Sequence, residues 1–172
     1  MCMNRQEFQQ LIQSIESDSF MSSNNWKRVS IDLSEQELES IEIKRLAHSL
    51  KKNHTITHID LSDNHIGDEE AKYIANALEE NNALMSLDLS DNHIGDEGAQ
   101  HIADVLKINT GLQYLDLEAN QISNEGAKAL AAALVINTTL IDLELMHNHI
   151  NQEGAKCIAT VPTQCDVSLE FL

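Results

Sequence analysis

A repeat of 28 residues constrains the fold of this chain more than any other feature of its sequence. Four copies of a short motif carry a central asparagine, and they read IDLSDNHIGDE, LDLSDNHIGDE, LDLEANQISNE and LELMHNHINQE. The asparagines are Asn64, Asn92, Asn120 and Asn148, so successive copies lie 28 residues apart. A fixed period of this size indicates repeats that stack on one another, because a single repeat cannot bury its own apolar face.

Each repeat has the pattern of one strand followed by one helix. Leu87 and Leu89 flank Asp88, which is the alternation of a strand with one buried face. After each asparagine the apolar residues fall at i, i+3, i+4 and i+7, as in an amphipathic helix. We expect these helices to begin at N-cap residues, namely Asp68, Asp96 and Asn124. A weaker copy, with Gln36 in place of the asparagine, precedes the four full ones.

The asparagines that recur are predicted to be structural. An asparagine side chain has both donors and an acceptor, so the motif asparagines can pair backbone groups that would otherwise be buried without partners. A second set follows the helices and consists of Asn53, Asn81, Asn109 and Asn137. We predict that this second set adopts the left-handed conformation that closes a helix.

The pattern L-x-x-L-x-L-x-x-N-x-L resembles that of leucine-rich repeat proteins. The period and the segment GDEGAQHIA resemble the ribonuclease-inhibitor-like subtype. This resemblance implies an α/β fold, a right-handed β-α superhelix in a short horseshoe arc, with a parallel concave sheet and convex helices. We predict an N-terminal helical cap over residues 1–28 and a leucine-rich repeat domain over residues 29–172, with about five repeats and a terminal strand.

The two ends of such an array need covers, because a solenoid exposes its apolar core there. Residues 6–16 place Phe8, Leu11, Ile12 and Ile15 on one helical face. We interpret this helix as the cover of the first repeat; the alternative is a helix that docks into a partner. At the other end VSLEFL is predicted to form the last strand, with Leu169 and Phe171 facing inward.

Stacking in register would align acidic residues along the concave surface. The outward strand positions are Asp32, Asp60, Asp88, Asp116 and Glu144, with Glu170 as an expected sixth. Beside them we expect His58, Ser86, Tyr114 and Asp142 on one side, and Ser62, Ser90, Glu118 and Met146 on the other. Tyr114 is the expected aromatic anchor. Ten of these are the candidate partner contacts: Asp60, Asp88, Asp116, Glu144, Asp142, Tyr114, His58, Ser86, Glu118 and Met146.

The charge of the chain indicates the kind of partner. With 28 acidic and 11 basic residues its net charge is -17, which disfavours nucleic acid and anionic membranes. The sequence therefore favours a non-catalytic interaction module that binds a protein with a basic surface. The concave strands span about 20–25 Å and present less than the roughly 800 Å² of a standard interface, so adjoining loops are expected to contribute. The alternative is that the acidic row is an ordinary solvated surface.

The sequence offers little for other chemistry. Its cysteines, Cys2, Cys157 and Cys165, have neither a disulfide framework nor zinc-ligand spacing, so we predict a cytoplasmic location. The histidines that recur, His65, His93 and His149, would be spread along the array, so no metal and no cofactor is predicted. No apolar run is long enough to span a membrane. We predict that the chain is not an enzyme.

Two further alternatives come from the resemblance. One relative of this repeat subtype activates a small GTPase, which implies a GTPase-activating or other enzyme-regulating role. Such a role generally requires an arginine, and of Arg5, Arg28 and Arg45 only Arg28 is expected at the strand edge. The chain is also similar to leucine-rich repeat effector proteins that some intracellular bacteria deliver into host cells, which implies the host cytosol as its location.

Overall fold

The computed structural model describes residues 4–17 and 29–169. Helices and strands alternate along this part of the chain, and no helix in it is both long and apolar enough to cross a membrane. The helices are α1 (Arg5–Glu16), α2 (Ser40–Leu50), α3 (Asp68–Leu78), α4 (Asp96–Leu106), α5 (Asn124–Leu134) and α6 (Gln152–Ala159). The strands are β1 (Val29–Asp32), β2 (Ile56–Asp60), β3 (Ser86–Asp88), β4 (Tyr114–Asp116), β5 (Asp142–Glu144) and β6 (Asp166–Ser168).

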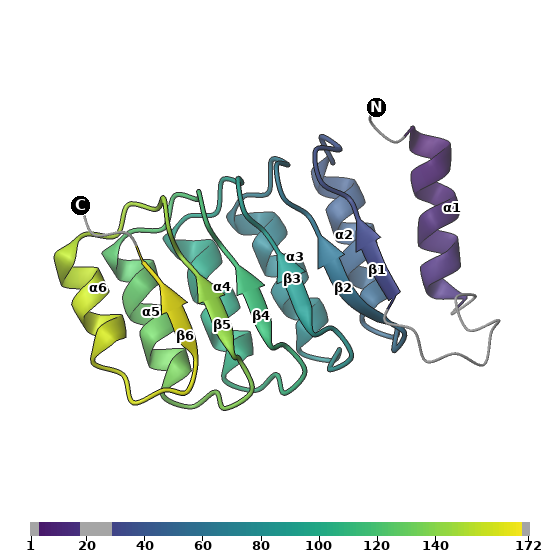
Figure 1. Ribbon diagram of the computed structural model, residues 1–172. Helices are drawn as coiled ribbons and strands as arrows, with labels where there is room; N and C mark the ends of the chain where they lie inside the picture. The colour runs from purple at the N-terminus through teal and green to yellow at the C-terminus, as the bar shows by residue number, and fades with distance from the viewer. Residues whose placement is uncertain (1–3, 18–28, 170–172) are drawn as a thin grey trace.

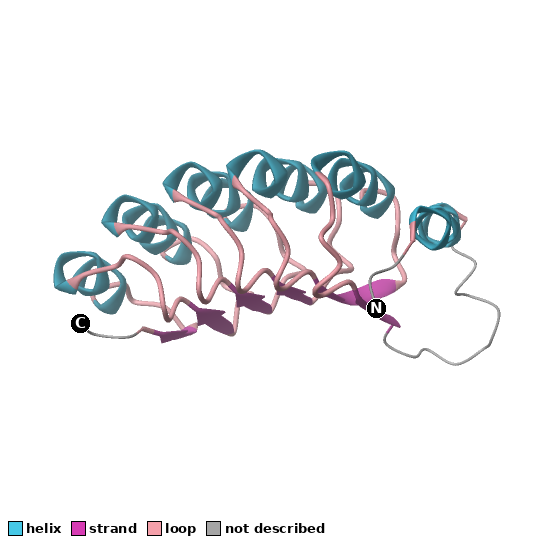
Figure 2. Cartoon of the chain, turned by 90° about the horizontal axis from the view of Figure 1, so that it is seen from above, coloured by secondary structure: helices cyan, strands magenta, loops and turns pink. Residues whose placement is uncertain are grey.

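The strands of the described residues form one parallel sheet in the order β1-β2-β3-β4-β5-β6. Helices and strands build two layers of a curved arc, with the sheet on the inner side and the helices on the outer side (Figures 1 and 2). Each strand thus pairs with the strand of the next repeat. The predicted α/β solenoid, with its parallel concave sheet and convex helices, is confirmed.

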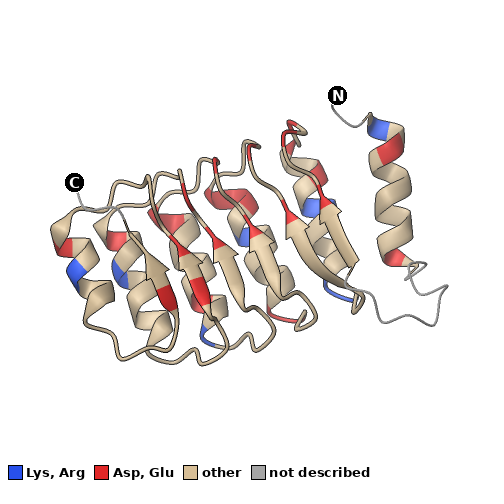
Figure 3. Ribbon diagram, in the orientation of Figure 1, with Lys and Arg blue, Asp and Glu red and all other residues tan. Residues whose placement is uncertain are grey.

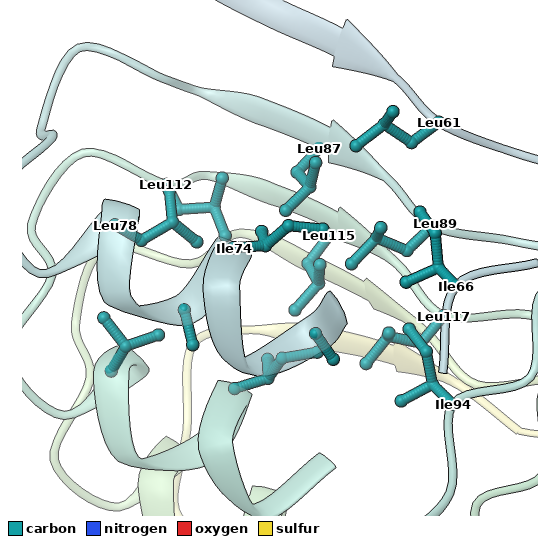
Figure 4. Close-up of a cluster of buried hydrophobic side chains, with 14 of the residues drawn as sticks. Leu61, Ile66, Ile74, Leu78, Leu87, Leu89, Ile94, Leu112, Leu115 and Leu117 are labelled. Atoms are coloured by element: carbon teal, nitrogen blue, oxygen red, sulfur yellow. The ribbon is translucent and has the colours of Figure 1, made fainter. Parts of the chain in front are cut away.

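The register of the sheet places equivalent residues of each repeat side by side. Leu87 pairs with Ile59 on one side and with Leu115 on the other, and Leu115 pairs with Leu143. All four side chains are buried between the sheet and the helices. Figure 4 shows Leu87 and Leu115 in this layer, near Ile74 of helix α3. The aliphatic core is therefore continuous from one repeat to the next.

The motif asparagines form the predicted ladder between repeats. The Asn92 Nδ2 group donates to the carbonyl oxygens of Leu61, Leu89 and Ser90 at 2.9–3.1 Å. Its Oδ1 atom accepts from the backbone N–H of Ile66 at 2.9 Å. One buried side chain thus satisfies backbone groups in its own repeat and in the preceding one. Asn64, Asn120 and Asn148 make the equivalent bonds.

The left-handed conformation predicted for the second set of asparagines, Asn53, Asn81, Asn109 and Asn137, is wrong. Asn81 uses its side chain instead: Nδ2 donates to the carbonyls of Leu50 and Asn53, and Oδ1 accepts from the N–H groups of Ala83 and Leu84. A second ladder therefore ties each helix end to the next repeat. Left-handed residues instead directly precede the motif asparagines, at Asp63, Asp91, Ala119 and His147, with φ from 49° to 55°. In the first, weaker repeat Glu35 and Glu37 on either side of Gln36 are also left-handed.

The N-caps predicted at Asp68, Asp96 and Asn124 are also wrong, because each is the first residue inside its helix. Asp96 caps the helix of the following repeat instead. Its carboxylate accepts from the N–H groups of Ser123 and Gly126 and from the Ser123 hydroxyl. Burial raises the pKa of Asp96, but these hydrogen bonds outweigh it and hold the pKa below its ordinary value. The acidic residue thus links two repeats.

Helix α1 covers the first repeat. Phe8, Ile12 and Ile15 are at most 2% exposed, and Leu11 packs at the edge of the same core. The buried Asn53 side chain donates to the carbonyl of Ile15 at 3.0 Å and so ties α1 to the end of α2. Residues 1–3 and 18–28 of the predicted cap lie outside the described residues.

The last strand differs in register from the prediction. Val167 pairs with Leu143, and Ser168 pairs with Glu144, so Ser168 occupies the sixth outward position. Glu170, predicted for that position, and Phe171 lie outside the described residues. The reason is a shorter final unit: Ser168 follows Glu144 by 24 residues, whereas earlier partners are 28 apart. Leu169 follows the strand and packs against the core, half-buried.

The asparagine ladder predicts a graded loss of stability. Replacing Asn92 by Ala should lower the free energy of unfolding by about 2–4 kcal/mol, because it leaves buried backbone groups without partners. The same change at Asn148, which is half-buried at the end of the ladder, should cost less. Urea unfolding followed by circular dichroism measures both values. Equal and small losses at the two positions would contradict a ladder that carries stability.

Candidate partner-binding face

The predicted row of carboxylates lies on the concave surface. Asp32 pairs in register with Asp60, Asp60 with Asp88, Asp88 with Asp116, and Asp116 with Glu144. Figure 3 shows the acidic positions recurring near the ends of the successive strands. Adjacent parallel strands are about 4.8 Å apart, so neighbouring charges repel by roughly 1 kcal/mol in water and roughly 3 kcal/mol at a surface-like dielectric. The fold therefore holds like charges close together.

Each aspartate of the row is held by a hydrogen bond at the end of its strand. The Oδ1 atom of Asp88 accepts from the backbone N–H of Ser90 at 2.9 Å and from its hydroxyl at 2.7 Å. Asp60 makes the same pair of bonds with Ser62, and Asp116 accepts from the N–H of Glu118. These bonds fix the carboxylates in place and give the aspartates a structural role beside any binding role.

Asp116 is the most perturbed member of the row. Burial raises its pKa to about 6; the hydrogen bond from Glu118 opposes the shift, and the charges of Asp88, Glu118 and Glu144 add to it. At the first strand the direction is opposite, because hydrogen bonds from Ser34 lower the pKa of Asp32. Burial therefore acts on the two aspartates differently: it dominates at Asp116 and is outweighed by hydrogen bonds at Asp32.

A shallow hollow surrounds Asp116. It has a volume of about 210 Å³ and is bounded by side chains of β3, β4 and β5. The lining residues are Ser86, Leu87, Asp88, Tyr114, Leu115, Asp116, Asp142 and Glu144. Four of these eight residues are acidic, and Tyr114 supplies an aromatic ring that is 43% exposed. The hollow combines negative charge with an aromatic surface, which suits a cationic side chain.

The row beside the carboxylates begins as predicted and extends further. His58, Ser86, Tyr114 and Asp142 are register partners on successive strands. His58 is half-buried, and its Nδ1 atom lies 2.8 Å from the hydroxyl of Thr57. Asp166, which the sequence analysis missed, pairs with Asp142 and adds a carboxylate. It was missed because the shorter final unit hides it from the 28-residue period.

The residues predicted on the other side follow the strands. Ser62 and Ser90 are engaged with the aspartates of the row. Glu118 is half-buried, with a carboxylate oxygen 3.5 Å from Nε2 of His147. Met146 is half-buried, and its carbonyl accepts from Ala119 and Asn148. Glu118 and Met146 thus lie at the edge of the face, farther from the hollow than Tyr114.

Exposed apolar residues on one rim were also missed. Ile108 and Ile136 follow helices α4 and α5 at equivalent positions, and Ile141 directly precedes strand β5; their exposed fractions are 61%, 56% and 48%. Lys52 and Glu80 occupy the positions of Ile108 and Ile136 in earlier repeats. That exchange of polar for apolar residues was a signal available in the sequence. The rim next to Asp142 can therefore contribute apolar contact area.

The described residues contain no group of three or more histidine, cysteine, aspartate or glutamate side chains placed to hold a metal ion. His65 and His93 stack with ring centroids 5.5 Å apart, as neighbours in a row. Cys157 and Cys165 are free thiols, and burial, followed by the charges of Asp142 and Asp166, raises the pKa of Cys165 to about 11. Such a thiol stays protonated and is a poor nucleophile.

The arginines do not lie on the concave face in the described residues. Arg5 begins helix α1, and Arg45 lies on α2 in the outer layer, where it donates to Gln9. Arg28, the position singled out for an enzyme-regulating role, lies outside the described residues.

Comparisons with known proteins support the repeat architecture. A family model described as Leucine Rich repeat matches residues 52–75, 80–103, 109–131 and 137–159, which together make up more than half of the chain. No curated protein sequence matches.

Two solved structures are similar over most of their length. A structure of leiomodin-1 actin-binding site 2 is 19% identical with a TM-score of 0.74, covering 91% of this chain and 88% of that chain. The tropomodulin C-terminal domain from Caenorhabditis elegans is 12% identical with a TM-score of 0.74, and 90% of each chain is covered. At these identities the likeness shows a shared fold.

The raised pKa of Asp116 predicts a pH-dependent stability. Its ordinary pKa is 3.8, so between about pH 4 and pH 6 the folded protein keeps a proton that the unfolded chain has lost. The free energy of unfolding should therefore fall as pH rises through this window. Asp116→Asn removes this loss and should stabilise the protein by about 1 kcal/mol at pH 7, a value reduced for solvent screening, with no gain below pH 4.

The matched control is Asp32→Asn. The pKa of Asp32 is lowered by its hydrogen bonds to Ser34, so neutralising it should give no gain at pH 7. Denaturant titrations of the three proteins from pH 3.5 to pH 8 measure the difference. Equal effects of the two substitutions at every pH would contradict the assignment of this pH-dependent loss of stability to Asp116.

Proposed function

This chain belongs to the leucine-rich repeat family, and we propose that it is a non-catalytic interaction module for a protein partner with a basic surface. The partner would contact the concave acidic face, which we define as Asp60, Asp88, Tyr114, Asp116, Asp142 and Glu144. His58, Ser86, Glu118 and Met146 would lie at the edges of the contact. A rigid array of repeats with variable outward positions is the usual scaffold for such binding.

The observation that carries this proposal is the hollow around Asp116. Four carboxylates and the Tyr114 ring converge there, held by backbone pairing and by hydrogen bonds to the strand ends. A lysine or arginine of the partner would relieve the repulsion within the row and could stack on the tyrosine ring. The positive charge of the partner would therefore supply both affinity and orientation.

The exposed rim supports a larger contact than the strands alone. Ile141 lies next to Asp142, and Ile108 and Ile136 lie on the loops of the same two repeats. Standard interfaces bury roughly 800 Å² per partner and have an apolar centre with a polar rim. We expect the partner to span the hollow and this rim, with apolar side chains beside its basic ones.

Other sequence predictions stay as proposals of narrower scope. We propose the division into a cap, residues 1–28, and a repeat domain, residues 29–172. The ribonuclease-inhibitor-like subtype, the enzyme-regulating role, the cytoplasmic location and delivery by a bacterium stay predictions from the sequence. The leiomodin structure is that of an actin-binding site, but at 19% identity its likeness to this chain concerns the fold alone.

Affinity capture with a charge-matched control tests the proposed function. The variant is Asp88→Asn/Tyr114→Ala/Asp116→Asn, which removes the Tyr114 ring and two negative charges. We expect it to recover at least about tenfold less of the partners that the unmodified chain captures at low salt. Asparagine keeps the oxygen that accepts the strand-end hydrogen bonds. Quantitative mass spectrometry of the captured proteins at low and high salt gives the measurement.

The control is Glu97→Gln/Glu125→Gln, which removes two exposed negative charges from the outer helices α4 and α5. It should capture the same partners as the unmodified chain. If the concave variant recovers the same proteins in the same amounts, or if the control loses them equally, the concave acidic face is not the binding surface.

A further inference from the structure

Helix α2 and its C-cap residue carry more basic side chains than the equivalent part of the later repeats. Its outward positions hold Lys44, Arg45 and His48, and Lys51 is its C-cap residue. The equivalent positions hold Lys72, Tyr73, Asn76 and Glu79 in the repeat of α3, and Gln100, His101, Asp104 and Lys107 in the repeat of α4. Only the lysine at position 44 therefore recurs in the next repeat. Four of the 11 lysines and arginines of the chain fall within residues 44–52. In a chain with a net charge of -17, this concentration of cations on α2 and directly after it exceeds that of the later repeats.

These residues line the groove between α1, α2 and α3. The cavity has a volume of about 440 Å³ and is bounded by Glu16, Ile41, Lys44, Arg45, Ala47, His48, Lys51, Tyr73 and Asn76. Ile41 is 53% exposed, although apolar residues elsewhere on the outer helices are mostly buried. The groove thus combines an apolar side chain and an aromatic ring with three permanent cations and one carboxylate.

The cations are held by weak, exposed contacts. The Lys44 ammonium lies 5.0 Å from the centre of the Tyr73 ring, and Lys51 pairs with Glu80 at 3.0 Å. Arg45 donates one hydrogen bond to Gln9 of helix α1, at 2.9 Å. Exposed pairs of this kind contribute little to stability, and a guanidinium has five donors. These groups can therefore bind an anion without a large loss of existing interactions.

We propose that this groove is a second binding site, separate from the concave acidic face, which accepts an acidic segment of a partner protein. The cations recur along about 10 Å of helix, from Lys44 to Lys51. This spread matches several carboxylates on one chain segment better than a single compact anion. The segment would place glutamates or aspartates against Lys44, Arg45 and Lys51, and an apolar side chain against Ile41 and Tyr73.

The site is independent of the proposed function because it lies on the outer layer and has the opposite charge. Helix α2 lies in the outer layer of the arc, and strand β4, which carries Asp116, lies in the inner layer (Figures 1 and 2). A partner with mixed charge, or two different partners, could then be held on the two layers at once. Failure at one site would leave the other unaffected.

Fluorescence anisotropy with a defined probe tests this site. The probe is a labelled peptide of alternating pairs of glutamate and single leucines, and the reference is the same peptide with glutamine in place of glutamate. At low ionic strength we expect the acidic peptide to bind and the reference to bind at least about fivefold more weakly. Lys44→Gln/Lys51→Gln should weaken the acidic peptide by about fivefold, because two exposed ion pairs are lost.

The control variant is Lys107→Gln/Lys128→Gln, which removes two ion-paired lysines from the region of α4 and α5 and gives the same net charge. Its affinity for the acidic peptide should lie within about 1.5-fold of that of the unmodified chain, because the local charge of the groove and not the net charge of the chain determines binding. Amide NMR shifts should move at Ile41, His48 and Tyr73 on peptide addition and stay constant at Tyr114 and Asp116.

Three results would overturn the proposal. The first is no detectable binding of the acidic peptide at low ionic strength. The second is equal weakening by the two lysine variants. The third is binding of citrate at the same residues with no binding of the peptide, which would assign the groove to a small anion. Because the concave-face variants are absent from this experiment, its outcome is separate from that of the proposed function.

Discussion

The register between neighbouring repeats is the constraint on which the rest of the structure depends. Buried asparagine amides hold it: each one pairs backbone groups of two successive strand ends, where mismatch would leave polar groups unpaired. Two further sets of side chains also bond to backbone groups of a neighbouring repeat. They are the second asparagine ladder at the helix ends and the acidic residues at the helix starts. Equivalent residues of successive repeats therefore lie side by side in rows. This holds for the leucines of the core and for the aspartates of the surface.

The acidic residue at the start of one helix bonds to the start of the next helix, and this bond explains why a glycine stands there, as with Asp68 and Gly98. A Cβ atom at Gly98 would lie 2.7 Å from Oδ1 of Asp68 and 2.8 Å from Ile94. The Asp68 carboxylate instead accepts from the Gly98 and Gly95 N–H groups. One repeat earlier, Ser40 stands at the position of Asp68, and Glu70 stands at the position of Gly98. Glu70 caps its own helix, because its carboxylate accepts from the N–H of Gly67. The acid of one repeat and the glycine of the next thus belong to one interaction.

Periodicity made most of the fold predictable, because it marks both what is buried and what lies side by side. The acidic row, the position of Tyr114 and the motif asparagine ladder all follow from spacing alone. The exchange of hydrogen bonds between repeats did not, since Asp96 has the local pattern of an N-cap and bonds instead to residues 27 and 30 positions away. Ser168 and Asp166 were missed because the final unit is shorter. The hollow and the basic groove depend on side chains from several elements, which no single-repeat pattern describes.

The same register that packs the core also places Asp116 between Asp88 and Glu144, so the electrostatics of the concave face are a direct consequence of the stacking. Carbon-detected NMR titration of the side-chain carboxyl groups measures this consequence most directly. The account predicts a pKa of about 6 for Asp116, well above the ordinary 3.8, and a lower pKa when Asp88 is replaced by Asn. A pKa near 3.8 that does not respond to Asp88→Asn would contradict the stacked, half-buried row.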